Sequence, residues 1–407
     1  MALNRLTEDE VAKRAGTTPT HIRRLAQLGI LEPQEGAFLP RDVLRARFVV
    51  DLDAMGVDAE AVAHALASGD LTLGYVEIGG GRPPRSDRTY AELSVEIDVP
   101  FRTLESIYVS FGLPRPSPDE YVREEDRKLL KFIPVLFAAG LSEGEVLRLA
   151  RVWGDSARRV AQFQSHFLHH SIEEPFRRRG LRDNEAFETA LSEVGVRAGR
   201  SGEDLLGWLY RRHSEVFLTE HLLDHVETAL EQAGVHRRAP RQVEGCVFAD
   251  LSGYTRLTEE AGDEAAARVS LKLSEVVNEI ASRHRGAVVK MLGDGVHFHF
   301  KDPHDAVLAS LRIIDSVRPA GLPPAHIGVN AGPMIYDEGD YFGRTVNLAA
   351  RIASQAGPHQ VYVGQDVLPH ITPRGFRLVE AGAFELKGIA GAQTLYEAVR
   401  DGGEGDP

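Results

Sequence analysis

Three short segments near the carboxyl-terminal end of the chain carry side chains that could together handle a metal-bound nucleoside triphosphate. VFADLSGYT carries one carboxylate, VVKMLGDG a lysine and a second carboxylate, and GDYFGRTVNLAAR a third carboxylate with an amide and a guanidinium. In order, these residues are Asp250, Lys290, Asp294, Asp340, Asn347 and Arg351. The elements that must position them can be predicted from the flanking residues.

Two of the carboxylates are predicted to lie at strand ends. Asp250 closes the apolar run VFAD, which is typical of a short buried strand. Asp294 lies between two glycines and two apolar runs, VVKML and VHFHF, which favours a hairpin turn. Two convergent carboxylates suit Mg²⁺ or Mn²⁺, and a pair of such ions can activate an attacking oxygen and neutralise a leaving phosphate. The sequence has no His/Cys cluster with zinc spacing.

The segment TVNLAARIASQ has helical spacing, with Val346, Ala350 and Ala353 on one side. Asn347 and Arg351 are four residues apart and therefore share the other face. A guanidinium binds phosphate in a fork geometry, and an amide beside it can hold a ribose oxygen. Both groups could stabilise charge that develops on phosphorus during a displacement.

From about Val243 to Arg400 the chain resembles the class III nucleotidyl cyclase catalytic domain. The resemblance runs through FADLSGYT, VVKMLGDG, GDYFGRTVNLAAR and the late FELKG segment, and covers about two fifths of the chain. It implies an α+β fold, in which a ferredoxin-like βαββαβ domain follows all-helical modules. It also implies an enzyme, adenylate cyclase, a phosphorus–oxygen lyase.

The resemblance implies a role for each motif residue. Asp250 and Asp294, with the backbone carbonyl of Leu251, would bind two Mg²⁺ or Mn²⁺ ions. Lys290 and Asp340 would read adenine, since guanylate-specific members usually carry Glu and Cys or a similar small residue there. The transition state would be stabilised by Asn347 and Arg351. Lys387, in ELKG, resembles a lysine that contacts phosphate.

The implied reaction is attack of the ribose 3′-hydroxyl of ATP on its own α-phosphate, giving 3′,5′-cyclic AMP and pyrophosphate. In this family the metal ligands come from one protomer, and the adenine readers with the amide and guanidinium come from the other. Because the chain has a single catalytic domain, a homodimer with two equivalent sites is expected.

Each of these features is ordinary when it occurs alone. An aspartate can cap a strand, Gly-Asp-Gly can be only a turn, and Asn347 with Arg351 can decorate a solvated helix face. The alternative interpretation is therefore that the protein is a non-catalytic regulator or transcription factor that retains the cyclase fold for dimerisation or nucleotide sensing. Intact metal carboxylates and Arg351 favour the enzyme. The glycines form neither GxxxxGK[ST] nor GxGxxG.

Composition predicts a globular cytoplasmic protein. The 407 residues are 43% hydrophobic and 26% charged, and no apolar run is long enough to span a membrane. MALNRLTEDE is not a signal peptide, and the single cysteine, Cys246, cannot form an intrachain disulfide. The net charge of −13 argues against broad nucleic-acid binding and against docking on anionic lipid.

The predicted domains are a helical module over 1–78, a linker over 79–89, an all-helical region over 90–236, the catalytic domain over 243–400 and a disordered tail over 401–407. Thr7 and Glu10 form a predicted capping box. The helix after it carries His21, Arg23 and Arg24, and the module resembles the helix-turn-helix of MerR-type regulators. An acidic surplus between Met1 and Ile78 argues against DNA binding.

The first module is repeated at an offset of 83 to 84 residues, with Gly29 opposite Gly112 and Phe48 opposite Phe132. The second copy has lost the basic face, since Leu104, Glu105 and Ser106 lie opposite His21, Ile22 and Arg23. The region over 90–236 resembles the regulatory domain of a group of bacterial cyclases, some of which respond to acid. Its histidines are His166, His169, His170, His213, His221, His225 and His236. They suggest pH control of the catalytic dimer; ordinary surface histidines and a lipid-binding pocket are the alternatives.

Overall fold

The computed structural model describes residues 5–74, 76, 85–235 and 243–401. The chain divides into two compact units, Met1–His221 and Leu222–Pro407, each with its own apolar core. Residues 236–242, between the predicted helical region and the predicted catalytic domain, lie outside the described residues, as do most of the 79–89 linker and nearly all of the tail. Within the described ranges, no helix has the length and apolar character needed to cross a bilayer.

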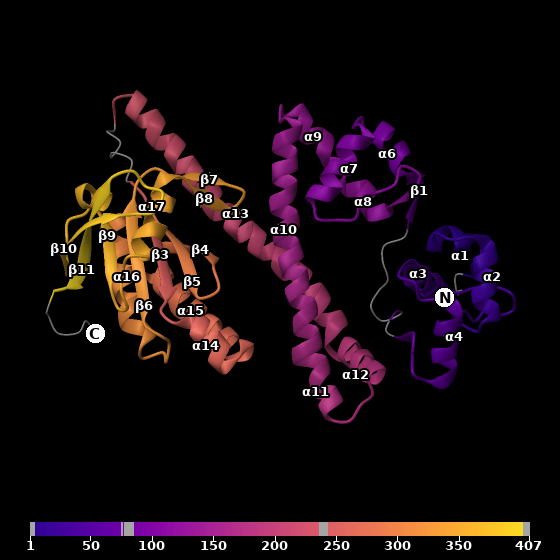
Figure 1. Ribbon diagram of the computed structural model, residues 1–407. Coiled ribbons are helices and arrows are strands. Elements are labelled where there is room, and N and C mark those ends of the chain that lie inside the picture. Colours follow the sequence, from indigo (N-terminus) through magenta and orange to yellow (C-terminus); the bar gives the residue numbers. More distant parts are fainter. Residues whose placement is uncertain (1–4, 75, 77–84, 236–242, 402–407) are drawn as a thin grey trace. The chain divides into compact units, whose positions relative to one another are not determined.

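In the residues that the structure describes, four helices build the first module of unit 1 (Figure 1). They are α1 Glu8–Ala15, α2 Pro19–Gln27, α3 Pro40–Ala54 and α4 Ala59–Ser68. The predicted capping box is confirmed: Glu10 N donates to Thr7 Oγ1 at 3.2 Å, and Thr7 N donates to Glu10 Oε2 at 2.8 Å. An antiparallel bridge between Leu6 and Phe38 closes the module over its core.

The basic face of α2 is neutralised within the module. Arg23 Nε lies 2.7 Å from Glu8 Oε1, and Arg24 pairs with Glu60. His21 Nε2 lies 3.7 Å from Asp53 Oδ2. A helix that reads DNA needs cations available for phosphate and base edges, so these pairs weigh against a DNA-reading role.

The second module follows the same plan. Its elements are β1 Arg85–Thr89, α6 Tyr90–Glu96, α7 Phe101–Ser110, β2 Tyr121–Arg123, α8 Glu124–Leu129, α9 Phe132–Ala138 and the start of α10 Glu143–Phe167. The prediction of an all-helical region is wrong here, because β1 and β2 form an antiparallel ribbon in which Thr89 pairs with Tyr121. β1 also occupies the end of the predicted linker.

Matching structural details support the predicted repeat. Thr89 forms a capping box with Glu92, as Thr7 does with Glu10. In both copies an antiparallel strand pairing lies at the start of the capped helix, Leu6 with Phe38 in the first and Thr89 with Tyr121 in the second. Gly29 and Gly112 both adopt positive φ, 74° and 72°. The two modules therefore share helix starts, turns and strand pairing.

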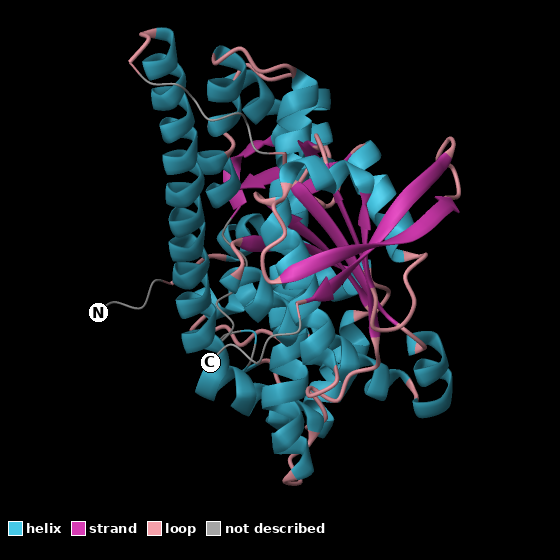
Figure 2. Ribbon diagram, turned by 90° about the vertical axis from the view of Figure 1, so that its left-hand side faces the viewer, coloured by secondary structure: helices cyan, strands magenta, loops and turns pink. Residues whose placement is uncertain are grey.

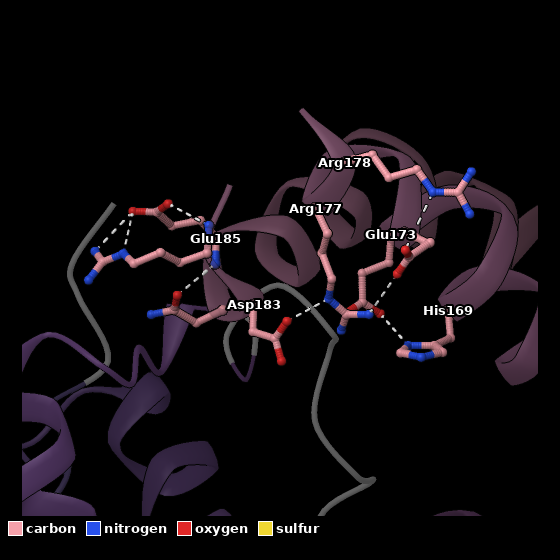
Figure 3. A network of polar contacts seen from close by, with 9 residues as sticks. His169, Glu173, Arg177, Arg178, Asp183 and Glu185 are labelled. Carbon is pink, nitrogen blue, oxygen red and sulfur yellow. Dashed lines mark hydrogen bonds and ion pairs between the residues drawn. The ribbon is translucent and has the colours of Figure 1, made fainter. Parts of the chain in front are cut away.

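The rest of unit 1 is helical. It comprises the π-helical turn η1 Leu168–Glu173, α11 Glu174–Arg178, α12 Asp183–Ala190, a second π turn η2 Leu191–Gly195 and most of the long α13 Val196–Gln232, whose last residues from Leu222 belong to unit 2. Figure 3 shows the polar network at α11. The carboxylate of Glu173, only 4% exposed, accepts from Arg177 and lies 2.9 Å from His169 Nδ1. Asp183 pairs with Arg177 Nε at 2.6 Å.

Unit 2 is built on a twisted seven-stranded sheet with the order β10-β11-β9-β6-β3-β5-β4 (Figure 2). Its strands are β3 Gly245–Leu251, β4 Gly286–Met291, β5 Gly295–Phe300, β6 Ala325–Ala331, β9 Val361–Gly364, β10 Phe376–Glu385 and β11 Ala392–Arg400. The strands β6, β3, β5 and β4 pair antiparallel, whereas β6 and β9 are parallel. The predicted α+β class is confirmed.

The two faces of this sheet differ in chemistry. Alternate residues such as Val247, Phe298 and Val329 pack under α15 Asp263–Arg283 and α16 Pro303–Val317 and form the main core. The opposite face carries Cys246 and Phe248, on which α17 Arg344–Ala353 lies. The remaining elements are α14 Tyr254–Ala261, the hairpin β7 Ile335–Asp337 with β8 Asp340–Phe342, and the 3₁₀ turn η3 Gln365–His370.

Candidate active site

The two predicted metal carboxylates lie at one end of the central strands. Asp250 is the penultimate residue of β3 and pairs in register with Gly295, the first residue of β5. Asp294 lies in the turn between β4 and β5, where Gly293 has φ of 81° and Leu292 N donates to Gly295 O at 2.7 Å. The predicted strand end and hairpin turn are therefore both present.

The electrostatics of this pair fit a cation. Burial first, and then the charge of Asp294, raise the pKa of Asp250, while His326 and the amide of Leu251 act in the opposite direction. A carboxylate whose ionisation is disfavoured by burial and by a neighbouring carboxylate is stabilised when a divalent ion neutralises it, and hard oxygen donors suit Mg²⁺ or Mn²⁺. Three or more His, Cys, Asp or Glu side chains do not gather into a metal cluster anywhere in the described residues.

The two predicted adenine-reading residues meet within one chain. Lys290, near the end of β4, donates from Nζ to Oδ2 of Asp340, the first residue of β8. The other oxygen, Oδ1, accepts from Tyr341 N at 2.8 Å. Burial alone would raise the pKa of Asp340, but these hydrogen bonds and the charge of Lys290 outweigh it and lower the pKa.

The β7–β8 hairpin positions Asp340. Asp337 pairs with Asp340, and the two residues between them, Glu338 and Gly339, have φ of 50° and 84°. Positive φ at both central positions is the geometry of a type I′ turn, whose twist suits a two-residue hairpin. Tyr341 anchors the hairpin to the sheet by stacking on His299, with ring centroids 4.5 Å apart.

Asn347 and Arg351 are exposed on α17, on the side away from the buried Val346 and Ala353. This confirms the predicted helix and its two faces. Gly328 of β6 allows the helix to approach the sheet, because a Cβ there would lie 2.1 Å from Ala353 N. Within the part of the chain that the structure describes, neither the side chain of Asn347 nor that of Arg351 has a hydrogen-bond or ion-pair partner. Both are therefore available to a ligand.

Lys387 is exposed in the connection between β10 and β11, next to the buried Leu386. No contact in the described structure joins it to the carboxylates or to α17. Its role as a phosphate contact, like that of the Leu251 carbonyl as a metal ligand, stays a prediction.

Three histidines on the site face were not among the residues predicted from the sequence. His326 pairs in register with Asp250; its Nδ1 donates to Ala353 O at 2.9 Å, and its Nε2 lies 3.7 Å from Asp250 Oδ2. His297 and His299 alternate along β5 beneath the hairpin. The run VHFHF looks apolar, but its alternation was the available signal, since a period of two separates histidines from Phe298 and Phe300.

Comparison with known proteins bears on the same region. Residues 239–398 match the sequence model of the family described as "Adenylate and Guanylate cyclase catalytic domain". The C-terminal region is therefore similar in sequence to cyclase catalytic domains. An adenylate cyclase of Glutamicibacter nicotianae is 27% identical over 355 residues, which are 85% of this chain and 84% of that protein. The match confirms the predicted enzyme class, a cyclase.

Other relatives match smaller shares. An adenylate cyclase of Streptomyces griseus is 29% identical over 245 residues, 59% of this chain and 57% of that protein. A protein of Mycobacterium tuberculosis named as a pH-sensitive adenylate cyclase is 26% identical over 330 residues, 77% of this chain and 79% of its own. The solved adenylyl cyclase CyaB of P. aeruginosa aligns at 22% identity and a TM-score of 0.36, covering 40% of this chain and 97% of that one.

Proposed function

We propose that this protein is an adenylate cyclase that converts ATP to 3′,5′-cyclic AMP and pyrophosphate. The observation that carries the proposal is the presence, on one sheet face, of two carboxylates at the β3 and β5 ends and of the Lys290–Asp340 pair. The first set suits a triphosphate with its cations, and the second offers one donor and one acceptor to a base edge. Relatives named adenylate cyclase support the choice of ATP.

The proposed reaction forms a bond between the ribose 3′-oxygen and the α-phosphorus and breaks the bond from that phosphorus to the α,β-bridging oxygen. The 3′-hydroxyl proton leaves to solvent, and pyrophosphate carries away the electron pair. Asp250, Asp294 and the Leu251 carbonyl would hold two Mg²⁺ or Mn²⁺ ions, which supply charge neutralisation and lower the pKa of the attacking hydroxyl. Arg351 would stabilise the charge on phosphorus, Asn347 would orient the ribose, and Lys387 would contact phosphate.

We further propose that the working unit is a homodimer with composite sites. In the described residues, the side chains of Asn347 and Arg351 form no hydrogen bond or ion pair, so none joins them to Asp250 or Asp294. A second copy would bring its α17 to the metal carboxylates. A symmetric pair of such contacts makes two equivalent sites.

The helical region before the catalytic domain is proposed to regulate it, with pH as the signal. The support is a cluster in which the rings of His166 and His170 lie 4.1 Å apart and those of His169 and His170 lie 4.8 Å apart. His213, His221 and His225 are exposed on α13, and His236 lies outside the described residues. The M. tuberculosis relative named as pH-sensitive points the same way.

We also propose a ferredoxin-like topology for the C-terminal domain and a cytoplasmic location for the protein. The order β6-β3-β5-β4, with α15 after β3 and α16 after β5, supports the ferredoxin-like βαββαβ assignment. The cytoplasmic location stays a prediction. The alternative of a non-catalytic or DNA-binding regulator is not favoured, because the comparisons point to a cyclase and the α2 cations are paired with carboxylates.

The proposal is tested by measuring cyclic AMP formed from ATP by the purified full chain with Mn²⁺ or Mg²⁺. Asp294→Asn should lower the rate by about 100-fold or more, because it removes one carboxylate of the site. Asp263→Asn, at an exposed carboxylate that begins α15, is the matched control and should leave the rate unchanged. Equal rates for the two variants, or no cyclic AMP from the parent, would overturn the proposal.

A further inference from the structure

A buried histidine lies directly behind the Lys290–Asp340 pair. His297, in β5, is 0% exposed, and its ring is stacked on Phe248 with centroids 4.5 Å apart and planes 6° from parallel. Its Nε2 lies 3.3 Å from Cys246 Sγ, and its Nδ1 lies 3.8 Å from Asp340 Oδ1. The ring thus links the interior of the sheet to the hairpin that carries Asp340.

The protonation of this ring follows from its surroundings. Burial lowers the pKa of His297 to about 4, so the ring is neutral at neutral pH and carries a single N–H. Burial also raises the pKa of Cys246 to about 12, so its sulfur remains a thiol. The thiol can donate to Nε2, and the ring proton then resides on Nδ1, the nitrogen that faces Asp340.

Nδ1 is buried and has no hydrogen-bond partner in the described structure. A buried donor without an acceptor is costly, and a movement of about 1 Å would close the 3.8 Å separation from Asp340 Oδ1 to a hydrogen bond. Oδ1 already accepts from Tyr341 N, whereas Oδ2 faces Lys290. Oδ1 is therefore held by the hairpin backbone and faces the His297 ring, and Oδ2 is held by Lys290, the other proposed adenine-reading residue.

Small displacements of Asp340 matter because the purine edges are near mirror images. Adenine offers an amino donor at C6 and an acceptor at N1, whereas guanine offers an acceptor at O6 and a donor at N1. A lysine donor and an aspartate acceptor can pair with either edge, in opposite order. Which purine they prefer depends on where the acceptor stands relative to the donor, and unpaired polar groups penalise the wrong base.

We propose that His297 is a positioning residue that fixes Asp340 relative to Lys290 and thereby contributes to the choice of ATP over GTP. This inference rests on the proposed function. His297 acts through Asp340 and does not itself touch the nucleotide. His299, on the same face of the same strand, packs on Tyr341 instead, so it provides a matched comparison.

The test compares His297→Phe with His299→Phe in the full chain, measuring cyclic AMP and cyclic GMP formation. Both variants keep a stacked ring, but only the first removes the donor facing Asp340. For His297→Phe we expect KM for ATP to rise about tenfold, the scale of one hydrogen bond to a charged group. The ratio of kcat/KM for ATP over GTP should fall about tenfold, with kcat changed much less, because base contacts act equally in the ground and transition states.

Rescue separates positioning from packing. His297→Asn places an amide donor near the Nδ1 position and should recover most of the ATP preference, whereas His297→Gln places it toward Cys246 and should not. This pair also decides the matter if His297→Phe does not fold. An ATP-over-GTP ratio that is the same in His297→Phe and His299→Phe, or in the Asn and Gln variants, would overturn the inference. A parent protein without cyclase activity would instead overturn the proposed function, and the inference with it.

Discussion

The carboxylates of Asp250 and Asp294 define the chemistry of the site at the scale of single residues. The raised pKa of Asp250 means that the folded protein holds its proton more tightly than the unfolded chain does. The contribution of Asp250 to the free energy of unfolding is thus greatest below the ordinary pKa of an aspartate. It is lost as the pH rises through the higher pKa of the folded state. At neutral pH the ionised Asp250 carboxylate therefore opposes folding until a cation neutralises it.

Asp250→Asn should therefore stabilise the metal-free protein. We expect the Tm at pH 7 to rise by only about 1 °C, because this half-exposed carboxylate is screened by solvent. Mn²⁺ or Mg²⁺ should raise the Tm of the parent by mass action, and that of Asp250→Asn much less. Thermal unfolding with and without EDTA provides the measurement. The same metal-induced shift in both proteins would exclude Asp250 as a ligand.

The six motif residues could be predicted because each follows from a local signal. A strand end, a Gly-Asp-Gly turn and an i, i+4 helical pair can all be recognised within about ten residues of sequence. The alternation in VHFHF indicates that His297 and His299 share one face of a strand. That this face adjoins Asp340, and that His326 lies beside Asp250, depends on pairing between strands far apart in the chain. His326 meets Asp250 only through the β3–β6 pairing. The supporting residues of the site therefore appear only with the fold.

The same limit applies to whole elements. Long periodic helices such as α10 and α15 were predictable, as was the duplication of the N-terminal module. The ribbon of β1 with β2 was missed, because one strand has three residues and the other begins at the end of a predicted linker. Short strands gain their stability from tertiary pairing rather than from their own sequence.

At the scale of elements, the contact between α17 and β6 holds Asn347 and Arg351 in place. Gly328→Ala would put a Cβ 2.1 Å from Ala353 N and 2.5 Å from Ala349 O, so the helix must move. We expect a loss of about 1–3 kcal/mol in unfolding free energy, the cost of overpacking, and a fall in cyclase rate beyond that loss. Denaturant titration and cyclic AMP assays measure both effects.

The matched control is Gly144→Ala in α10, where an added Cβ meets nothing within 4 Å. That change should stabilise the helix slightly, since alanine has the higher helix propensity. If Gly328→Ala were as active and stable as Gly144→Ala, close packing of α17 on the sheet would not matter for the site.

At the scale of the whole molecule, the N-terminal region is expected to make the activity depend on pH. Removal of the residues before Val243 should flatten the pH–activity profile between about pH 5 and 8, where histidines titrate. The measurement is cyclic AMP formation across this range for the full chain and the truncated chain, each with its oligomeric state determined. If the full and truncated chains are both dimeric and their pH–activity profiles superimpose, the N-terminal region does not sense pH.

The most direct test of the account is complementation between two inactive variants. Asp294→Ala lacks a metal carboxylate and Arg351→Ala lacks the guanidinium, so a mixed dimer regains one intact composite site from the two unaltered halves. With equal amounts and free exchange of subunits, half of the dimers are mixed, and about one quarter of the parent rate should return. Recovery of cyclic AMP formation at that level is the predicted result. No recovery, with mixed dimers demonstrated and the parent active, would contradict a site shared between two copies of this chain.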